Sequence, residues 1–79
     1  MTIMELHYQK FAEILPEDER YEIELDQLLD MIIISTDDVI IHSDTAAKIY
    51  DYCARHSLRC YISWSDVSKR IRLAISKKI

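Results

Sequence analysis

Glycine is missing from this chain of 79 residues. Phosphate-binding loops, nucleophile elbows and dinucleotide-binding turns use glycine because their backbone takes a positive φ or approaches a ligand closely. The absence therefore excludes the usual form of each of these sites. The turns of the chain must instead use Asp, Ser and Thr, whose short side chains can hydrogen-bond to the turn backbone.

Long apolar segments and a basic leader are missing as well. The longest unbroken apolar run, Met31 to Ile34, is far shorter than the roughly 20 residues that a membrane-spanning helix needs. The N-terminal stretch MTIMELHYQK has no basic segment ahead of an apolar one, so it does not have the pattern of a secretory signal. With two cysteines and no export signal, we expect a cytoplasmic protein without a membrane segment.

The short length predicts a single domain over residues 1–79. A chain of this size buries only about 60% of the surface that its unfolded form exposes, so we expect marginal stability. Binding of a partner or self-association, for example as a homodimer, would stabilise such a chain.

Charge is distributed unequally along the sequence. Residues 1–52 contain 13 acidic and three basic side chains, a net charge of −10, whereas residues 53–79 contain seven basic and one acidic side chain, a net charge of +6. The whole chain has a net charge of −4. This segregation predicts either two surfaces of opposite charge or a pairing of the two halves within one molecule.

Two helices are predicted at the N-terminus, on either side of the only proline, Pro16. Thr2 and Glu5 have capping-box spacing, and the first helix should end near Leu15 because the residue before proline disfavours the α region. After Pro16, three acidic residues and a helical apolar spacing predict the second helix. The alternative for residues 21–26 is a half-buried strand, because apolar and acidic residues alternate there.

The rest of the chain predicts four strands and one helix. MIIIS (31–35) and VIIHS (39–43) are short β-branched runs on either side of TDD, which suits a tight turn. A helix should then begin at Ser43 or Asp44 and bury one apolar face. The residues of that face are Ala46, Ile49, Tyr50 and Cys53.

The last two strands should form a hairpin, LRCYISW (58–64) and RIRLAIS (70–76). Apolar residues alternate with polar ones in both segments. The inward residues are expected to be Leu58, Cys60, Ile62, Trp64, Ile71, Leu73 and Ile75. A helix is the alternative for residues 66–76, but the matching apolar phase favours two paired strands.

These elements predict an α+β fold. Two N-terminal helices precede a ββαββ body, in which one helix packs on a small four-stranded mixed sheet. The strand–helix–strand connection in the middle of the body should be a right-handed crossover between parallel strands.

The two cysteines and a histidine lie close together in the sequence, as Cys53, His56 and Cys60. The spacing Cys-x2-His-x3-Cys matches none of the common structural zinc patterns. Both cysteines also fall on the apolar faces of their predicted elements, where a free cysteine behaves as a small hydrophobic residue. We therefore expect core packing, with no metal and no cofactor. Asp37 and Asp38 suit a solvated turn, and the sequence shows no catalytic set, which argues against an enzyme.

Two charged surfaces remain as candidate binding sites. The first is an acidic helical face that would dock onto a protein with a basic surface. Its residues are Glu13, Glu17, Asp18, Glu19, Glu22, Glu24, Asp26 and Asp30. The second is a basic face of the C-terminal sheet, where cations beside an aromatic ring could bind phosphates and stack a base. Its residues are Arg59, Tyr61, Lys69, Arg70 and Arg72.

We therefore expect a small acidic, cytoplasmic, non-enzymatic interaction protein that binds another protein through its acidic face. Regulators and inhibitors of this type include mobile-element inhibitors, antitoxins and immunity proteins, and the comparison is one of size and charge alone. The alternative is a small nucleic-acid-binding regulator that uses the basic face. The net charge of −4 disfavours this alternative, because nucleic-acid-binding domains are usually basic.

Overall fold

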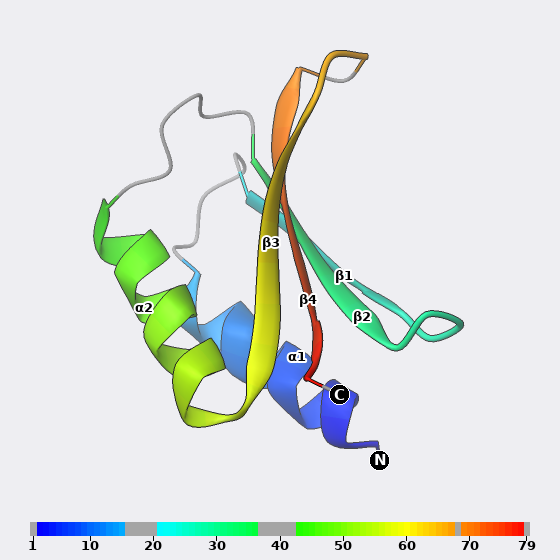
Figure 1. Ribbon diagram of the computed structural model, residues 1–79, viewed down its shortest axis with the longest axis vertical. Helices are drawn as coiled ribbons and strands as arrows, with labels where there is room; N and C mark the ends of the chain where they lie inside the picture. Colours follow the sequence, from blue (N-terminus) through cyan, green and yellow to red (C-terminus); the bar gives the residue numbers. More distant parts are fainter. Residues whose placement is uncertain (1, 16–20, 37–42, 68, 79) are drawn as a thin grey trace.

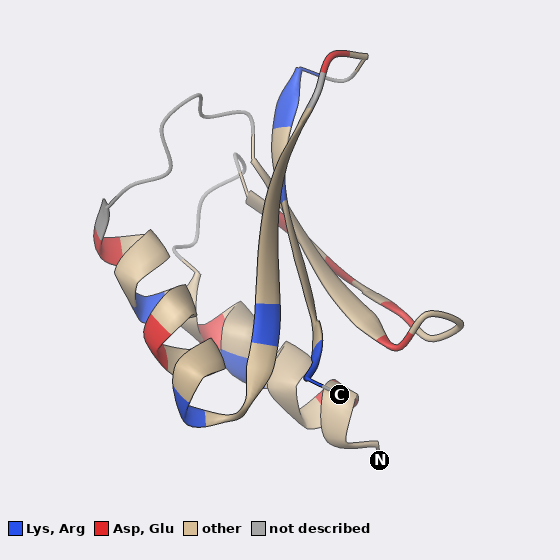
Figure 2. Cartoon of the chain, in the orientation of Figure 1, with Lys and Arg blue, Asp and Glu red and all other residues tan. Residues whose placement is uncertain are grey.

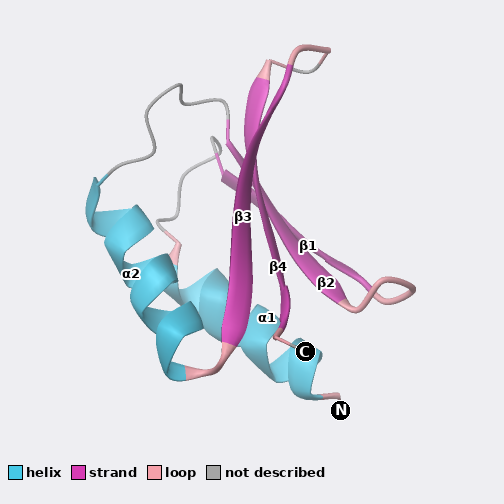
Figure 3. Cartoon of the chain, in the orientation of Figure 1, coloured by secondary structure: helices cyan, strands magenta, loops and turns pink. Residues whose placement is uncertain are grey.

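The computed structural model describes residues 2–15, 21–36, 43–67 and 69–78. Two helices cover one face of a twisted four-stranded sheet, which gives a two-layer α+β arrangement (Figures 1 and 3). The elements are α1 (Ile3–Ile14), β1 (Tyr21–Asp26), β2 (Met31–Thr36), α2 (Ser43–Arg55), β3 (Leu58–Ser65) and β4 (Arg70–Lys77). Neither helix in the described part of the chain is long and apolar enough to cross a membrane.

The strand order in the sheet is β1-β2-β4-β3, and all neighbouring strands are antiparallel. The predicted α+β class and a four-stranded sheet are confirmed, and three of the predicted strands correspond to β2, β3 and β4. The predicted mixed sheet is wrong, because β4 lies between the strands that α2 connects. β2 and β3 each pair with β4 in antiparallel fashion, so they run parallel to each other without being neighbours.

The second predicted helix is wrong, because residues 21–26 form strand β1. The register with β2 places Tyr21, Ile23 and Leu25 opposite apolar or small β2 residues, on the helix-covered face. Asp26 then ends the strand by accepting hydrogen bonds from the backbone N–H groups of the next turn, including that of Leu28, at 3.1 Å. Leu28 is 99% exposed in this turn.

The predicted strand VIIHS cannot be compared in full. Residues 39–42 lie outside the described residues, and Ser43, its last residue, belongs to α2. The edge position that a fourth strand would occupy next to β2 is taken by β1.

The first helix begins and ends as its sequence predicts. Thr2 Oγ1 accepts a hydrogen bond from the Glu5 N–H at 3.2 Å, which is the expected N-cap contact. Leu15 takes an extended conformation ahead of the proline, and its N–H donates to the Phe11 carbonyl. The cap and the proline therefore set the two limits of α1.

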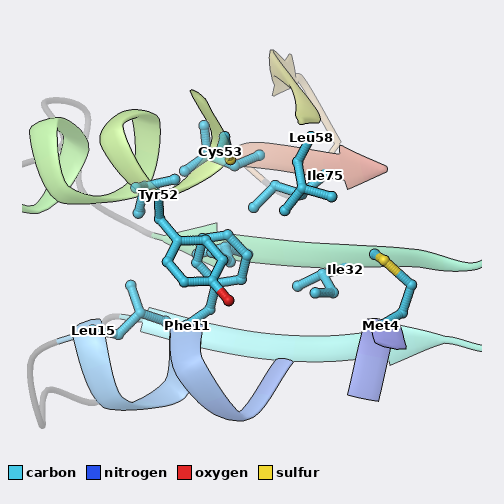
Figure 4. Close-up of a cluster of buried hydrophobic side chains, with 11 residues drawn as sticks. Met4, Phe11, Leu15, Ile32, Tyr52, Cys53, Leu58 and Ile75 are labelled. Carbon is cyan, nitrogen blue, oxygen red and sulfur yellow. The ribbon is translucent and has the colours of Figure 1, made fainter. Parts of the chain in front are cut away.

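The core lies between the two helices and the sheet (Figure 4). The largest fully buried side chains come from both helices and from the two central strands. They are Met4, Phe11, Ile32, Ile34, Thr36, Ile49 and Ile75. Burial of these side chains removes apolar surface from water and supplies the main favourable term of folding.

The C-terminal hairpin is confirmed, and the helical alternative for residues 66–76 is wrong. Leu73 and Ile75 face the helices as predicted. Ile62 and Trp64 were predicted to be inward, but they are 55% and 47% exposed. The reason is that the distal half of the hairpin extends beyond the two helices, so its inner side has no helix above it (Figure 1).

Within the described ranges, three residues take a positive φ: Asp30, Ser57 and Lys69, with φ values of 53°, 54° and 58°. Each lies in a connection, and Ser57 is the second residue after α2 ends at Arg55, a position where glycine is common. A left-handed conformation costs a residue with a Cβ atom about 1–2 kcal/mol.

Replacing Ser57 with glycine is expected to raise the free energy of unfolding by about 0.5 kcal/mol. Relief of the left-handed strain outweighs the greater entropy of glycine in the unfolded chain. Ser63→Gly in the extended strand β3 is the matched control and should lower the stability by about 0.5–1 kcal/mol. Urea unfolding followed by circular dichroism measures both, and equal losses in the two variants would contradict the prediction.

Candidate functional site

The outer face of the sheet is the face opposite α1 and α2, and neither helix covers it (Figure 1). Side chains of a strand alternate between the two faces, so the neighbours of the buried residues point outward. The outward side chains of β1 are acidic, and those of β2 are apolar or small. On β4 they are two arginines followed by small residues, and on β3 they include Arg59 and Tyr61. Figure 2 shows acidic residues along β1 and basic residues on β3 and β4.

The strand register orders these outward side chains in rows. One row runs Glu22, Ser35, Arg72, Ser63 across the four strands, and the next runs Glu24, Ile33, Ala74, Tyr61. The outer face thus changes from acidic at β1 to basic and aromatic at β3. On the outer face, β1 and β2 from the acidic half of the sequence therefore lie beside β4 and β3 from the basic half.

The acidic end of the outer face surrounds a shallow hollow of about 370 Å³. Its lining residues are Glu22, Ile23, Glu24, Ile33 and Ser35. Both glutamates are exposed, and the half-buried Ile33 lies between β1 and β4 at the centre of the face. The hollow therefore combines two carboxylates with an apolar surface and a hydroxyl group.

Glu22 is held in place by an ion pair across the sheet. Arg70 Nη1 lies 3.2 Å from Glu22 Oε1, and the arginine side chain is only 20% exposed. The carboxylate of Glu22 remains largely open to solvent, at 69% exposure. Arg70 thus positions the glutamate without removing it from the surface.

The other predicted acidic residues that the structure describes do not join this hollow. Glu13 is on α1 beside Lys10, at 3.7 Å, and Asp30 is in the β1–β2 turn beside Lys77, at 3.5 Å. Asp26 binds its own turn, whereas Glu17, Asp18 and Glu19 lie outside the described residues. The expected acidic helical face is therefore wrong. Its central residues form an acidic strand face instead, because residues 21–26 pair with β2.

Three of the five residues of the predicted basic face remain available on the outer side of the sheet. Arg59 and Tyr61 share the outer side of β3, where Arg59 Nη1 donates to Tyr61 Oη at 3.5 Å, and Arg72 is exposed on the neighbouring strand. Arg70 is engaged by Glu22, and Lys69 lies in the turn before β4. The remaining cluster is Arg59, Tyr61 and Arg72.

A buried polar contact joins the two helices behind the sheet. His7 Nδ1 of α1 lies 2.7 Å from the Tyr52 hydroxyl of α2. The Tyr52 ring stacks on His56 at 4.1 Å and meets the edge of Phe11 at 4.8 Å. Burial lowers the pKa of His7, and electrostatic repulsion from His56 and Lys77 lowers it further. His7 is therefore neutral near pH 7 and serves as an interhelical hydrogen-bonding group.

The sequence interpretation missed Tyr52 and assigned Tyr50 to the apolar face instead. The buried face of α2 runs through Thr45, Ile49, Tyr52 and Cys53, while Tyr50 is exposed. The spacing of this face, four and then three residues, was available as a signal. Two tyrosines two positions apart satisfied neighbouring faces equally well, so the sequence pattern alone did not separate them.

The two cysteines meet between α2 and β3. Cys53 belongs to the buried core, and the half-buried Cys60 packs against it, as predicted. A hydrogen bond between the two thiols, together with burial, raises the pKa of Cys53, and the same hydrogen bond lowers the pKa of Cys60. Within the described ranges, no three His, Cys, Asp or Glu side chains form a group that could hold a metal ion.

Stability is expected to fall at acidic pH through His7. Because the folded-state pKa of His7 is below its ordinary value, the unfolded chain binds more protons below about pH 6.5. The contribution of His7 is thus fully present above about pH 6.5 and is lost as the pH falls through the folded-state value. Urea unfolding between about pH 5 and 8 should show this slope in the wild type, most of it in His56→Gln, which keeps the burial of His7, and the smallest slope in His7→Gln. An unchanged slope in His7→Gln would refute the assignment.

Cys60 is expected to react with iodoacetamide before Cys53. Its pKa is lowered and its side chain is half-buried, whereas the pKa of Cys53 is raised and its side chain is buried. Peptide mass spectrometry of the native protein after timed labelling at about pH 8 measures both rates. The difference should disappear after unfolding in urea. Faster labelling of Cys53 in the native protein would contradict the prediction.

Comparison of this chain with models of known protein families, with curated proteins and with solved structures finds no match. A function must therefore be inferred from the surfaces of the molecule itself. The outer face of the sheet is the surface on which exposed charge, an apolar patch and a hollow come together.

Proposed function

We propose that this chain is a small, non-enzymatic regulator or inhibitor that binds a basic surface of another protein. The binding site is the acidic end of the outer face, defined by Glu22, Glu24, Ile33 and Ser35. The observation that carries the proposal is the hollow between two exposed glutamates on a sheet face that neither helix covers.

The chemistry of the hollow suits an arginine or lysine side chain. Long basic side chains pack their aliphatic stems on apolar surface while the charged end stays with water or an anion. Ile33 offers the apolar surface, and the carboxylates of Glu22 and Glu24 offer charge-assisted hydrogen bonds. Acidic residues around such a contact also accelerate encounter with a basic partner.

The position of β1 at the edge of the sheet adds to this argument. Along the free edge of β1, the backbone N–H and C=O groups that point away from β2 can pair with an added strand. Glu22 and Glu24 would lie opposite the outward residues of that strand, where basic side chains stabilise the pairing and acidic ones oppose it. A basic extended segment is therefore a favourable form for the partner surface.

Reversal of the two glutamates should abolish partner binding. With the protein immobilised and exposed to host lysate, wild type should retain a salt-sensitive set of proteins that Glu22→Lys/Glu24→Lys loses. The matched control, Glu13→Lys/Asp51→Lys, changes the net charge by the same amount on the exposed surfaces of α1 and α2. It should retain that set.

Quantitative binding to a partner identified in this way should weaken at least about tenfold in Glu22→Lys/Glu24→Lys, equivalent to about 1.4 kcal/mol. Circular dichroism and urea unfolding establish that each variant is folded. Equal capture by both double variants, or no difference between wild type and the Glu22/Glu24 variant, refutes the proposed site.

Nucleic-acid binding is the second candidate, and one observation favours it. Arg59, Tyr61 and Arg72 lie together on the opposite end of the outer face, with Tyr61 58% exposed. Arginines beside an exposed aromatic ring can bind phosphates and stack a base. A gel shift with mixed-sequence single-stranded DNA and RNA at low salt tests it. Binding should be lost in Arg59→Ala/Arg72→Ala and kept in the glutamate variant, and no shift in the wild type excludes this function.

A further inference from the structure

The two edges of the sheet differ in charge. β1 carries Glu22, Glu24 and Asp26 in six residues, so pairing between two copies of this strand would set like charges against each other. β3 contains a single charged residue, Arg59, in eight. The edge that β3 presents therefore lacks the charge that commonly prevents strands of different molecules from pairing.

β3 also exposes large apolar side chains on both of its sides. Tyr61 points to the outer face, and Ile62 and Trp64 point to the inner face, where they remain exposed. Each of the three side chains is about half exposed. Neighbouring exposed apolar residues of this kind mark an interaction surface.

We propose that β3 is a homodimer interface, at which β3 of a second copy pairs in antiparallel fashion. The two-fold axis would stand perpendicular to the sheet and join two four-stranded sheets into one. A two-fold axis makes the contact self-complementary, so the features of one strand must match those of the same strand reversed.

The position of the charge on β3 is compatible with this condition. Arg59, the one charged residue of the strand, lies near its start, so an antiparallel pair places the Arg59 side chains of the two copies at opposite ends of the interface. A parallel arrangement would instead bring the two cations together. The carboxylate of Asp66, which accepts a hydrogen bond from Trp64 Nε1 at 3.1 Å, stays with Trp64 at the other end of the strand.

Residues opposite each other must point to the same face, which limits the register to pairings centred on a residue of β3. We centre the axis on Ile62, an exposed apolar residue near the middle of the strand. Ile62 then meets Ile62 of the second copy, and Trp64 meets Cys60 of that copy, so the inner apolar row continues across the interface. On the outer side, Tyr61 lies opposite Ser63 of the second copy. The pairing covers the apolar side chains that the monomer leaves exposed.

Sedimentation velocity of the full chain from about 1 to 500 µM tests the interface. Wild type should show a concentration-dependent monomer–dimer equilibrium. Ile62→Lys would bring two cations together at the axis and should raise the dimer dissociation constant at least about tenfold. Leu6→Lys, at a 50% exposed position on α1, is the matched control and should dimerise like the wild type. A monomeric wild type over the whole range, or equal weakening by Leu6→Lys, overturns the proposal.

Neither of these substitutions touches Glu22 or Glu24, so loss of the dimer and loss of partner binding are measured separately.

Cross-linking gives an independent readout of the register. Opposite Cβ atoms in an antiparallel pair are about 4.5–5.5 Å apart, close to the separation that a disulfide spans. Ile62→Cys should therefore form a disulfide-linked dimer under mild oxidation, reversible by reductant, whereas Leu6→Cys should not. Equal cross-linking of the two variants overturns the register.

Discussion

β2 is hydrogen-bonded on both sides, to β1 and to β4, and its register decides which side chains of three strands face the helices. Ile32 and Ile34 are the points at which the three strands share the buried row. A slip of one residue between β1 and β2 would turn Glu22 and Glu24 into the core and Ile23 into solvent. The cost of burying carboxylates therefore fixes the acidic residues on the outer face.

The same constraint explains why the local sequence of residues 21–26 misled the helix prediction. Acidic residues after Pro16 suit a helix start, and the apolar spacing beyond them fits a helix and a strand about equally well. The strand wins through its pairing with Ile32 and Ile34, a contact between segments that no local pattern contains. Features decided locally, such as the Thr2 cap, the end of α1 and the C-terminal hairpin, were predictable.

The site was predictable only in part, for a related reason. The sequence separates acidic from basic residues along the chain, but the sheet order places β1 and β4 on either side of β2, so Glu22 meets Arg70. The exposure of Ile62 and Trp64 follows from element lengths. α2 spans roughly 20 Å and the strands of the hairpin roughly 26 Å, so the helix cannot cover the hairpin to its tip. Alternation predicts the face of a side chain and not what lies above it.

The two proposed surfaces are geometrically compatible. β1 and β3 are the opposite edges of the sheet, so pairing through β3 leaves both β1 strands at the far ends of the joined sheet. An axis perpendicular to the sheet keeps the two outer faces on the same side, so a dimer would present both acidic hollows in one direction. Two sites on one rigid sheet raise the effective concentration for a partner with two basic segments. Dimerisation through β3 would thereby strengthen binding at β1 without any change in the contacts of a single hollow.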